Sequence, residues 1–292
     1  MIDTDPGVDD FLAIALALNS PEIHIEAFTT TGGNAALRHT NSNMLRILEA
    51  LNATRIPVYR GAQRPLVGKF GDAEDIHGTG GLPIRLPAPK LRPRSEPAVR
   101  YLVQRLKDGP PVTLVALGPP TNIARLFRDH PETRASVERL VIMGGALDVP
   151  GNVTPYAEFN VWSDPEATEL VFGSGVPVTM VGSDVCNLVR VYDETTPDAV
   201  NPSIRRLTEA QYAARPGRRI TLYDPLTVMS VIRPDLVTLE KLPISVDVSD
   251  GPERGRTTQK VNGNVIDVAT GVDVGAALDL FIERTINGRF NS

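Results

Sequence analysis

Short apolar runs alternate with amphipathic segments along this chain, and that alternation constrains the fold more than any other feature. The apolar runs are rich in Val, Ile, Leu and Thr, which favours strands, at residues 23–31, 56–60, 112–117, 140–143 and 177–182. Segments with helical spacing lie between them, at residues 35–50, 97–107 and 121–129. Asp164, followed by Pro165, is expected to cap a further helix. This order predicts an α/β fold with a mostly parallel central sheet covered by helices on both faces.

Composition narrows the class of protein. The length of 292 residues suits either two domains or one large α/β domain. The 41% hydrophobic and 22% charged residues exclude a disordered chain. No run of 18 or more apolar residues is present, so we expect no transmembrane helix and no membrane partner. The acidic opening MIDTDPGVDD does not resemble a secretory signal, so we expect a cytoplasmic protein.

Net charge and cysteine content argue against a nucleic-acid partner and exclude sites built from several cysteines. The net charge of −5 argues against a nucleic-acid partner, because such proteins usually carry a basic excess. Cys186 is the only cysteine, so the chain can form neither an internal disulfide nor a Cys-rich metal site. Beside a strand, a lone cysteine is usually a small buried apolar residue.

Two segments break the strand–helix pattern. Residues 64–96 are rich in Pro and Gly and contain HGTGGLP. Residues 205–222 combine Tyr212 with Arg215, Arg218 and Arg219. Long irregular segments in a compact domain are often functional, so both are candidates for mobile active-site loops. Ordinary surface loops are the alternative.

Four aspartates crowd the end of a very short first strand: Asp3, Asp5, Asp9 and Asp10. Ligands of open α/β sheets bind outside the carboxyl ends of the strands, which is where this cluster would lie. Carboxylates so close repel one another unless a proton or cation intervenes. Hard cations with oxygen ligands, Ca²⁺ or Mg²⁺, fit this set. A turn with a helix cap is the alternative, and it explains only one or two of the four.

Two familiar motifs were compared with this cluster. An EF-hand loop starting at Asp3 would need Gly and Glu where Val8 and Ile14 stand, so it is excluded. The Asp3-Thr4-Asp5 sequence also resembles the DxD of haloacid dehalogenase phosphatases, in which the first Asp is the nucleophile. That alternative stays open, although the later acidic pair of those enzymes is not evident.

Further polar residues follow later strands: Asn34, Asn152, Glu158, Asn160 and Asp224. Each alone has an ordinary explanation as a loop residue or a helix cap, as Asp224 before Pro225 illustrates. Together they place Asp, Asn and Glu side chains at the ends of several β–α units. Such a set suits a polyhydroxyl ligand held beside a metal ion.

The opening Asp3-Thr4-Asp5-Pro6-Gly7-Val8-Asp9-Asp10 resembles the signature of the nucleoside hydrolases, the inosine–uridine-preferring N-ribohydrolase family. The resemblance spans nearly the whole chain. It continues in the segments TGGN (31–34), HG (77–78), LGP and TNIA (117–124), MGG (143–145), GN (151–152), AEFN (157–160), DPEA (164–167) and DP (224–225). It implies a single α/β domain over residues 1–292, acting in nucleoside salvage.

The resemblance also implies site roles. Ca²⁺ would be held by the carboxylates of Asp5, Asp10 and Asp224 and by the carbonyl of Leu117, and Asp5 would take a proton from the attacking water. Residues expected to bind the ribose hydroxyls are Asp9, Asn34, Asn152, Glu158 and Asn160. Asp3 would not contact the metal or the ribose itself but would hold the residues that do. Members of the family form dimers or tetramers, so a homo-oligomer is expected. Cleavage of the ribosyl C–N bond passes through an oxocarbenium-like state, which surrounding carboxylates stabilise.

The residue before the last metal aspartate departs from the family pattern. Pyrimidine-accepting members often have a His there that assists the leaving base, and purine-preferring members are better known for Trp. This chain has Tyr223. Stacking on a purine would favour protonation of the leaving ring, although Tyr223 could instead donate its proton or only line the pocket. His77 is a candidate base contact, and Tyr212 and Arg219 are weaker candidates.

The sequence therefore predicts a Ca²⁺-dependent ribonucleoside hydrolase with a preference for purine nucleosides. Two alternatives stay open: the phosphatase, and a nucleoside-binding protein that has lost catalysis. The missing His at position 223 favours it, and the retained Asp5 and Asp224 argue against it.

Overall fold

The computed structural model describes residues 1–194, 196–215 and 217–290. Within these residues, nine strands form one sheet in the order β10-β9-β11-β6-β5-β4-β1-β2-β3. Its parallel strands are β1 (Ile2–Thr4), β2 (Phe28–Thr30), β3 (Val58–Arg60), β4 (Val112–Ala116), β5 (Val137–Met143), β6 (Val178–Val181) and β11 (Asn264–Val272). At one edge β9 (Val237–Val246) pairs antiparallel with both β11 and β10 (Thr257–Gln259). The predicted mostly parallel sheet is confirmed.

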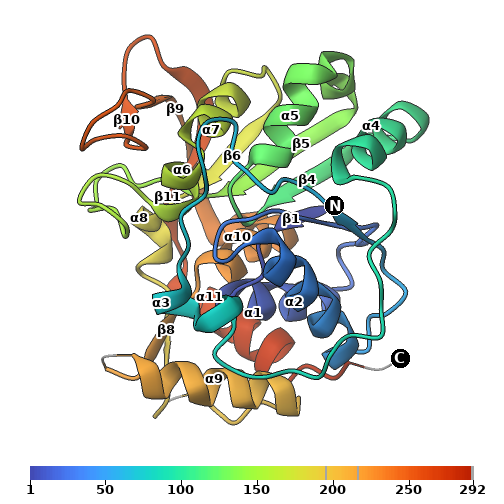
Figure 1. Ribbon diagram of the computed structural model, residues 1–292. Helices are drawn as coiled ribbons and strands as arrows, with labels where there is room; N and C mark the ends of the chain where they lie inside the picture. The colour runs from blue at the N-terminus through green and yellow to red at the C-terminus, as the bar shows by residue number, and fades with distance from the viewer. Residues whose placement is uncertain (195, 216, 291–292) are drawn as a thin grey trace.

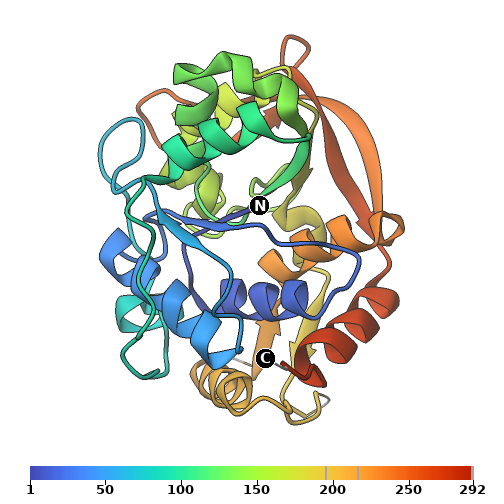
Figure 2. The ribbon, with the colours of Figure 1, turned by 90° about the vertical axis from the view of Figure 1, so that its right-hand side faces the viewer.

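Helices cover both faces of this sheet (Figures 1 and 2). One face carries α1 (Val8–Leu18), α2 (Leu37–Ala50), α10 (Tyr223–Ile232) and α11 (Val274–Phe281). The other carries α4 (Ala98–Asp108), α5 (Thr121–Asp129) and α7 (Pro165–Phe172). Shorter helices are α3 (Glu74–His77), α6 (Phe159–Ser163) and α8 (Ser183–Cys186). Short 3-10 helices lie at Thr79–Gly81, Pro131–Ser136 and Pro234–Leu236, and a π-helical turn follows α11 at Ile282–Ile286. As predicted, the Asp164 carboxylate caps α7, accepting from the Ala167 amide.

The hydrophobic core is split between the two faces of the sheet. Along β4, the side chains of Leu114 and Ala116 pack with the α4–α5–α7 layer. The alternate residues Val115 and Leu117 pack with the α1–α10 layer. Because successive side chains of a strand point to opposite faces, a strand covered on both sides needs apolar residues throughout. This explains why the central strands are continuous apolar runs.

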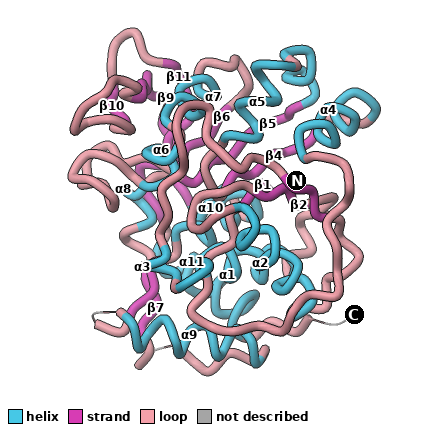
Figure 3. Tube along the Cα trace, in the orientation of Figure 1, coloured by secondary structure: helices cyan, strands magenta, loops and turns pink. Residues whose placement is uncertain are grey.

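A smaller unit lies beside the main sheet. It consists of α9 (Pro202–Ala214) and the antiparallel pair β7 (Arg190–Tyr192) and β8 (Arg219–Thr221), at the bottom of Figure 1. In the tube view the magenta strands of the main sheet lie above this unit (Figure 3). The described part of the chain contains no helix long and apolar enough to cross a membrane.

Two expectations need correction. Of residues 23–31 only Phe28–Thr30 form a strand. Residues 205–222 are not a loop but most of α9 and all of β8; Pro216 lies outside the described residues. The helix forms because Ile204, Leu207 and Tyr212 are buried on one side of it. Residues 64–96 contain only α3, the turn Thr79–Gly81 and otherwise irregular backbone, and their mobility stays a prediction.

Candidate active site

A cavity of about 560 Å³ lies at the carboxyl ends of the parallel strands. All predicted site residues except Asp5 and Asp10 line it: Asp9, Asn34, His77, Leu117, Asn152, Glu158, Asn160, Tyr223 and Asp224. They come from segments far apart in the sequence, and the parallel sheet brings them together because every β–α connection leaves from the same edge.

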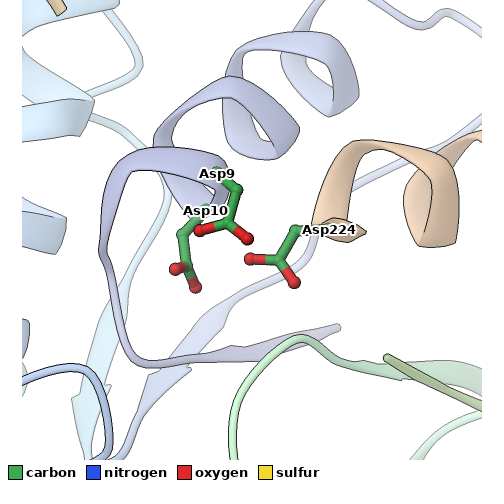
Figure 4. A group of neighbouring side chains, drawn as sticks. All are labelled: Asp9, Asp10 and Asp224. Atoms are coloured by element: carbon green, nitrogen blue, oxygen red, sulfur yellow. The ribbon is translucent and has the colours of Figure 1, made fainter. Parts of the chain in front are cut away.

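Two helix N-termini bring three carboxylates together. Asp9 and Asp10 lie in the first turn of α1, and Asp224 lies in the first turn of α10 (Figure 4). One oxygen from each lies within 4.8 Å of the others. We call these three residues the aspartate cluster. Helix N-termini favour negative charge, so both helices stabilise it. A set of oxygen ligands at this spacing could hold a hard divalent cation.

Asp10 is fixed in place by its neighbours. Its Oδ1 accepts a hydrogen bond from the Thr4 hydroxyl. Its Oδ2 accepts from the Gly7 amide at 2.8 Å and from the Asn34 side-chain amide at 3.1 Å. The carboxylate is therefore held in one orientation before any ligand binds.

Asp5 lies fully buried between two glycines. Its Oδ2 accepts from the Asn34 amide at 2.6 Å, and its Oδ1 is buried without a hydrogen-bond partner. A Cβ on either Gly33 or Gly118 would overlap this carboxylate, so both positions require glycine. A buried carboxylate oxygen without a partner is costly. Asp9, which lines the cavity, also carries such an oxygen. The unpartnered oxygens of Asp5 and Asp9 fit a site that receives a cation or a water molecule.

Burial and mutual repulsion set the electrostatics of these groups. Burial, and then the charges of its neighbours, raises the pKa of Asp224 and that of Asp5 well above the usual range. Burial also raises the pKa of Asp9 and that of Asp10. Crowded carboxylates hold protons unless a cation neutralises them. The residues therefore fit a divalent metal ion by charge as well as by donor type.

Glu158 and Asn160 form a further part of the cavity lining. Glu158 precedes α6, and its carboxylate accepts from the amides of Gly145 (3.0 Å), Asn160 (3.0 Å) and Val161 (3.2 Å). Burial nevertheless raises the pKa of Glu158 to about 7. The Asn160 side chain donates to the carbonyl of Leu117 at 2.8 Å. A carbonyl has two lone pairs, so Leu117 retains one for a second partner.

Asn152 differs from the other candidates because it is exposed. Its Oδ1 accepts a hydrogen bond from the Phe159 amide at 2.8 Å, next to Glu158 and Asn160. This contact leaves the Asn152 side-chain NH₂ group as its donor toward a ligand.

His77 is held as a neutral imidazole. Its Nδ1 accepts from the Val8 amide at 3.1 Å and lies 3.8 Å from an Asp9 oxygen. Burial lowers the pKa of His77 to about 4. The ring proton must then sit on Nε2, because Nδ1 is the acceptor. His77 can therefore offer a hydrogen bond to a ligand without carrying a charge.

Tyr223 is half-buried, and its hydroxyl donates to Asn187 Oδ1 at 2.9 Å. Burial raises the pKa of Tyr223 to about 12. A hydroxyl with such a pKa and an engaged proton is a poor general acid near neutral pH.

Asp3 and Tyr212 do not line the cavity. Asp3 Oδ1 accepts from the Thr29 hydroxyl and from Asn122 Nδ2 at 2.7 Å, so this carboxylate ties β1 to β2 and α5. The Tyr212 ring packs in the hydrophobic core. Arg219 does line the cavity.

Sequence reasoning missed several cavity residues, among them Trp162, Gln211 and Arg215. Gln211 has a buried Oε1 without a partner, and Arg215 donates to the Ile76 carbonyl at 3.3 Å. Helical spacing with Leu207 was the available signal for Gln211. No sequence signal was available for Trp162, because its spacing of two residues from Asn160 does not predict that its side chain faces the cavity.

Comparison with known proteins decides the family. A family model described as inosine-uridine preferring nucleoside hydrolase matches residues 1–279. The chain belongs to this nucleoside hydrolase family. A pyrimidine-specific ribonucleoside hydrolase, RihA of Escherichia fergusonii, is 37% identical over 302 residues, covering 97% of each chain.

Solved nucleoside hydrolases share the fold. A purine-preferring ribonucleoside hydrolase from Gardnerella vaginalis superposes with a TM-score of 0.90 at 32% identity, covering 97% of this chain and 96% of the other. A plant nucleoside hydrolase, PpNRh1, gives 0.92 at 30% identity, covering 98% of each. The family is one of N-glycosidic bond hydrolases, so this nucleoside hydrolase is a ribonucleoside-cleaving enzyme. The phosphatase alternative loses its basis, because the nucleoside hydrolase family model matches residues 1–279.

Proposed function

We propose that this nucleoside hydrolase is Ca²⁺-dependent, that Asp5 activates the attacking water, and that purine ribonucleosides are its preferred substrates. The observation that carries the proposal is the buried, unpartnered Asp5 Oδ1 next to the aspartate cluster. A bound divalent cation would lower the pKa of water and orient it for attack. The residues that would hold the cation are Asp5, Asp10, Asp224 and the Leu117 carbonyl. The third member of the aspartate cluster, Asp9, would bind a ribose hydroxyl beside the cation.

The chain's own residues supply the rest of the reaction. Asp5 accepts the proton of the water through Oδ1, while Oδ2 stays bonded to the Asn34 amide. Asp9, Asn34, Asn152, Glu158 and Asn160 bind the ribose hydroxyls. As the C–N bond breaks, its electron pair leaves with the base, which takes up a proton from water. Positive charge develops on the ribose ring, where the surrounding carboxylates stabilise it, and the oxygen of the attacking water bonds to the ribose carbon that the base has left.

The base end of the cavity favours binding by ring face and by neutral hydrogen bonds. Tyr223 offers its ring, because its hydroxyl is engaged by Asn187. His77 offers an uncharged N–H donor. Aromatic stacking contributes about 0.5–1.5 kcal/mol beyond area burial, and a purine presents a larger face than a pyrimidine. The purine preference of the Gardnerella enzyme supports this choice, whereas RihA is pyrimidine-specific.

The role of Asp5 is tested by Asp5→Asn, which keeps the shape and the Asn34 contact but cannot accept a proton. We expect kcat for inosine to fall at least roughly 10²-fold with an unchanged circular dichroism spectrum. A folded Asp5→Asn variant with near-parental kcat would refute the role of Asp5.

Base preference is tested by kcat/KM for inosine and uridine. The parent should prefer inosine, Tyr223→Phe should keep most of that activity, and Tyr223→Ala should lose it. Uridine turned over faster than inosine would reject the purine preference and leave the hydrolase activity standing.

The cytoplasmic location and the homo-oligomer stay predictions. Light scattering after gel filtration measures the oligomeric state.

A further inference from the structure

We propose that Asn187 is a positioning residue for Tyr223, holding its ring as a wall of the base pocket and keeping its hydroxyl proton away from the leaving base. This inference rests on the base-pocket role proposed above for Tyr223. It concerns two residues at the end of α8, Cys186 and Asn187, which we call the α8 buttress. α8 contacts α10, whose first residue is Tyr223 (Figure 1).

The backbone brings the buttress and Tyr223 together. After α8 the chain runs beside the segment that leads into α10: the Leu222 amide donates to the Val189 carbonyl at 3.0 Å, and β7 pairs with β8. The Asn187 amide donates to the Ser183 carbonyl at 3.0 Å, so the residue is fixed to the end of α8. Its side chain is therefore presented by rigid backbone and not by a free loop.

The buttress contacts Tyr223 at both ends. The Tyr223 hydroxyl donates to Asn187 Oδ1 at 2.9 Å. At the other end, the Cys186 thiol lies 3.8 Å from the Tyr223 carbonyl, a weak hydrogen bond. The same carbonyl accepts from the Thr227 hydroxyl at 3.2 Å. Ring and backbone of Tyr223 are thus both tied down, directly before Asp224 of the aspartate cluster.

The direction of the Asn187 contact has a chemical consequence. A tyrosine hydroxyl has one proton, and donation to Asn187 leaves only its lone pairs for a substrate. Tyr223 can then contact a base through its ring face or as a hydrogen-bond acceptor. Asn187 itself does not line the cavity, so it acts through Tyr223.

A double-mutant cycle tests this inference. The variants are Asn187→Ala, Tyr223→Phe and the double variant, assayed as kcat/KM on inosine and on uridine. Each single change removes the same hydrogen bond, so each should lower kcat/KM for inosine by the same small factor, about 2-fold, with most of the activity retained. The double variant should be no worse than Tyr223→Phe. If the loss of kcat/KM in the double variant equals the product of the losses in the two single variants, the inference is overturned. An Asn187→Ala variant with parental activity would overturn it as well.

Asn187→Asp tests the direction of the hydrogen bond. The aspartate keeps an acceptor oxygen in place of Oδ1 but has no NH₂ donor. The kcat/KM of Asn187→Asp should therefore be closer to that of the parent than the kcat/KM of Asn187→Ala is. An Asp variant as damaged as the Ala variant would show that the hydroxyl does not donate to residue 187. Leu188→Ala is the matched control, because the neighbouring Leu188 side chain is 56% exposed; its kinetics should be parental.

The outcome is separable from that of the proposed function. If the parent prefers uridine, the purine proposal fails, and the same cycle is evaluated with uridine as substrate. If Asn187→Ala does not fold, Asn187→Ser replaces it, because serine is too short to reach the hydroxyl and carries the same prediction. The unfolding midpoint of each variant separates lost positioning from lost stability.

Discussion

At the scale of single residues, the site is a set of carboxylates buried without cationic side chains bonded to them. Asp5 and Asp9 each keep a buried oxygen without a partner, and Asp10 accepts only from a hydroxyl and two amides. Such an arrangement is unfavourable for the isolated chain and favourable once a cation binds. It concentrates negative charge where the reaction develops positive charge.

Asp10→Asn should nearly abolish calcium binding. It keeps an acceptor for the Gly7 amide and removes one charge from the aspartate cluster. Losing a group that merely supports a ligand weakens metal affinity by about 10–100-fold, so losing a ligand charge should exceed that. Isothermal titration with Ca²⁺ measures the change. Asp75→Asn is the control, because Asp75 lines the cavity outside the cluster and its variant should bind as the parent does. Parental affinity in Asp10→Asn would contradict the assigned ligand.

Nine of the eleven predicted site residues line the cavity, because the motif DTDPGVDD spans the end of β1 and the motif AEFN leads into α6. What sequence could not predict is which atoms remain free. The Leu117 carbonyl already accepts from Asn160, and the Tyr223 hydroxyl already donates to Asn187. These contacts join residues far apart in the chain, and no local spacing encodes them.

At the scale of elements, the loops that follow β2 and β4 shape the pocket of Asp5. Gly33 and Gly118 approach its carboxylate from two sides. Gly33→Ala and Gly118→Ala should each destabilise the fold by about 1–3 kcal/mol through overpacking. A carboxylate displaced by about 1 Å should also lower kcat roughly 10²-fold. Thermal unfolding and inosine kinetics measure the two effects.

Gly275→Ala is the matched control for these glycines. Gly275 is exposed in the first turn of α11, and the nearest atom to an added Cβ would be 3.6 Å away. The change should be neutral or stabilise by about 0.4–1 kcal/mol, because alanine reduces the entropy of the unfolded chain. Gly33→Ala and Gly118→Ala variants with parental kcat would contradict the packing described for Asp5.

Element prediction succeeded where the pattern is local. The very short first strand, Ile2–Thr4, and the cap of α7 at Asp164 are confirmed. The loop expected at residues 205–222 was wrong. The arginines of this segment are typical of an exposed loop and gave no indication that one side of α9 is buried. The antiparallel edge of β9 and β10 went unpredicted, since residues 238–241 of β9 are all exposed and give the strand no apolar run.

At the scale of the whole molecule, the buried carboxyls link stability to pH. Burial raises the pKa of Asp3 and that of Glu158 to about 7, whereas unfolded Asp and Glu titrate at about 3.9 and 4.3. Between these values the folded state binds more protons than the unfolded state. The free energy of unfolding of the metal-free protein should therefore fall as pH rises from about 4 to about 7.

Calcium should reverse that loss. With chelator, the unfolding midpoint should be lower at about pH 8 than at about pH 5, and added Ca²⁺ should raise it more at the higher pH, because protons compete with the cation for the aspartate cluster. Differential scanning fluorimetry measures both conditions. A calcium effect that is equal at the two pH values, or larger at the lower one, would contradict the linkage.

The central claim is that Ca²⁺ held by Asp5, Asp10, Asp224 and the Leu117 carbonyl drives hydrolysis of ribonucleosides. The most direct measurement is the release of reducing sugar from inosine, uridine and other ribonucleosides by the parental enzyme, first stripped with a chelator and then reloaded with Ca²⁺ alone. We expect ribose release to fall at least roughly 10²-fold on stripping and to return on reloading, with inosine preferred. Undiminished release by the stripped enzyme, or no ribose from any ribonucleoside after reloading, would contradict the account.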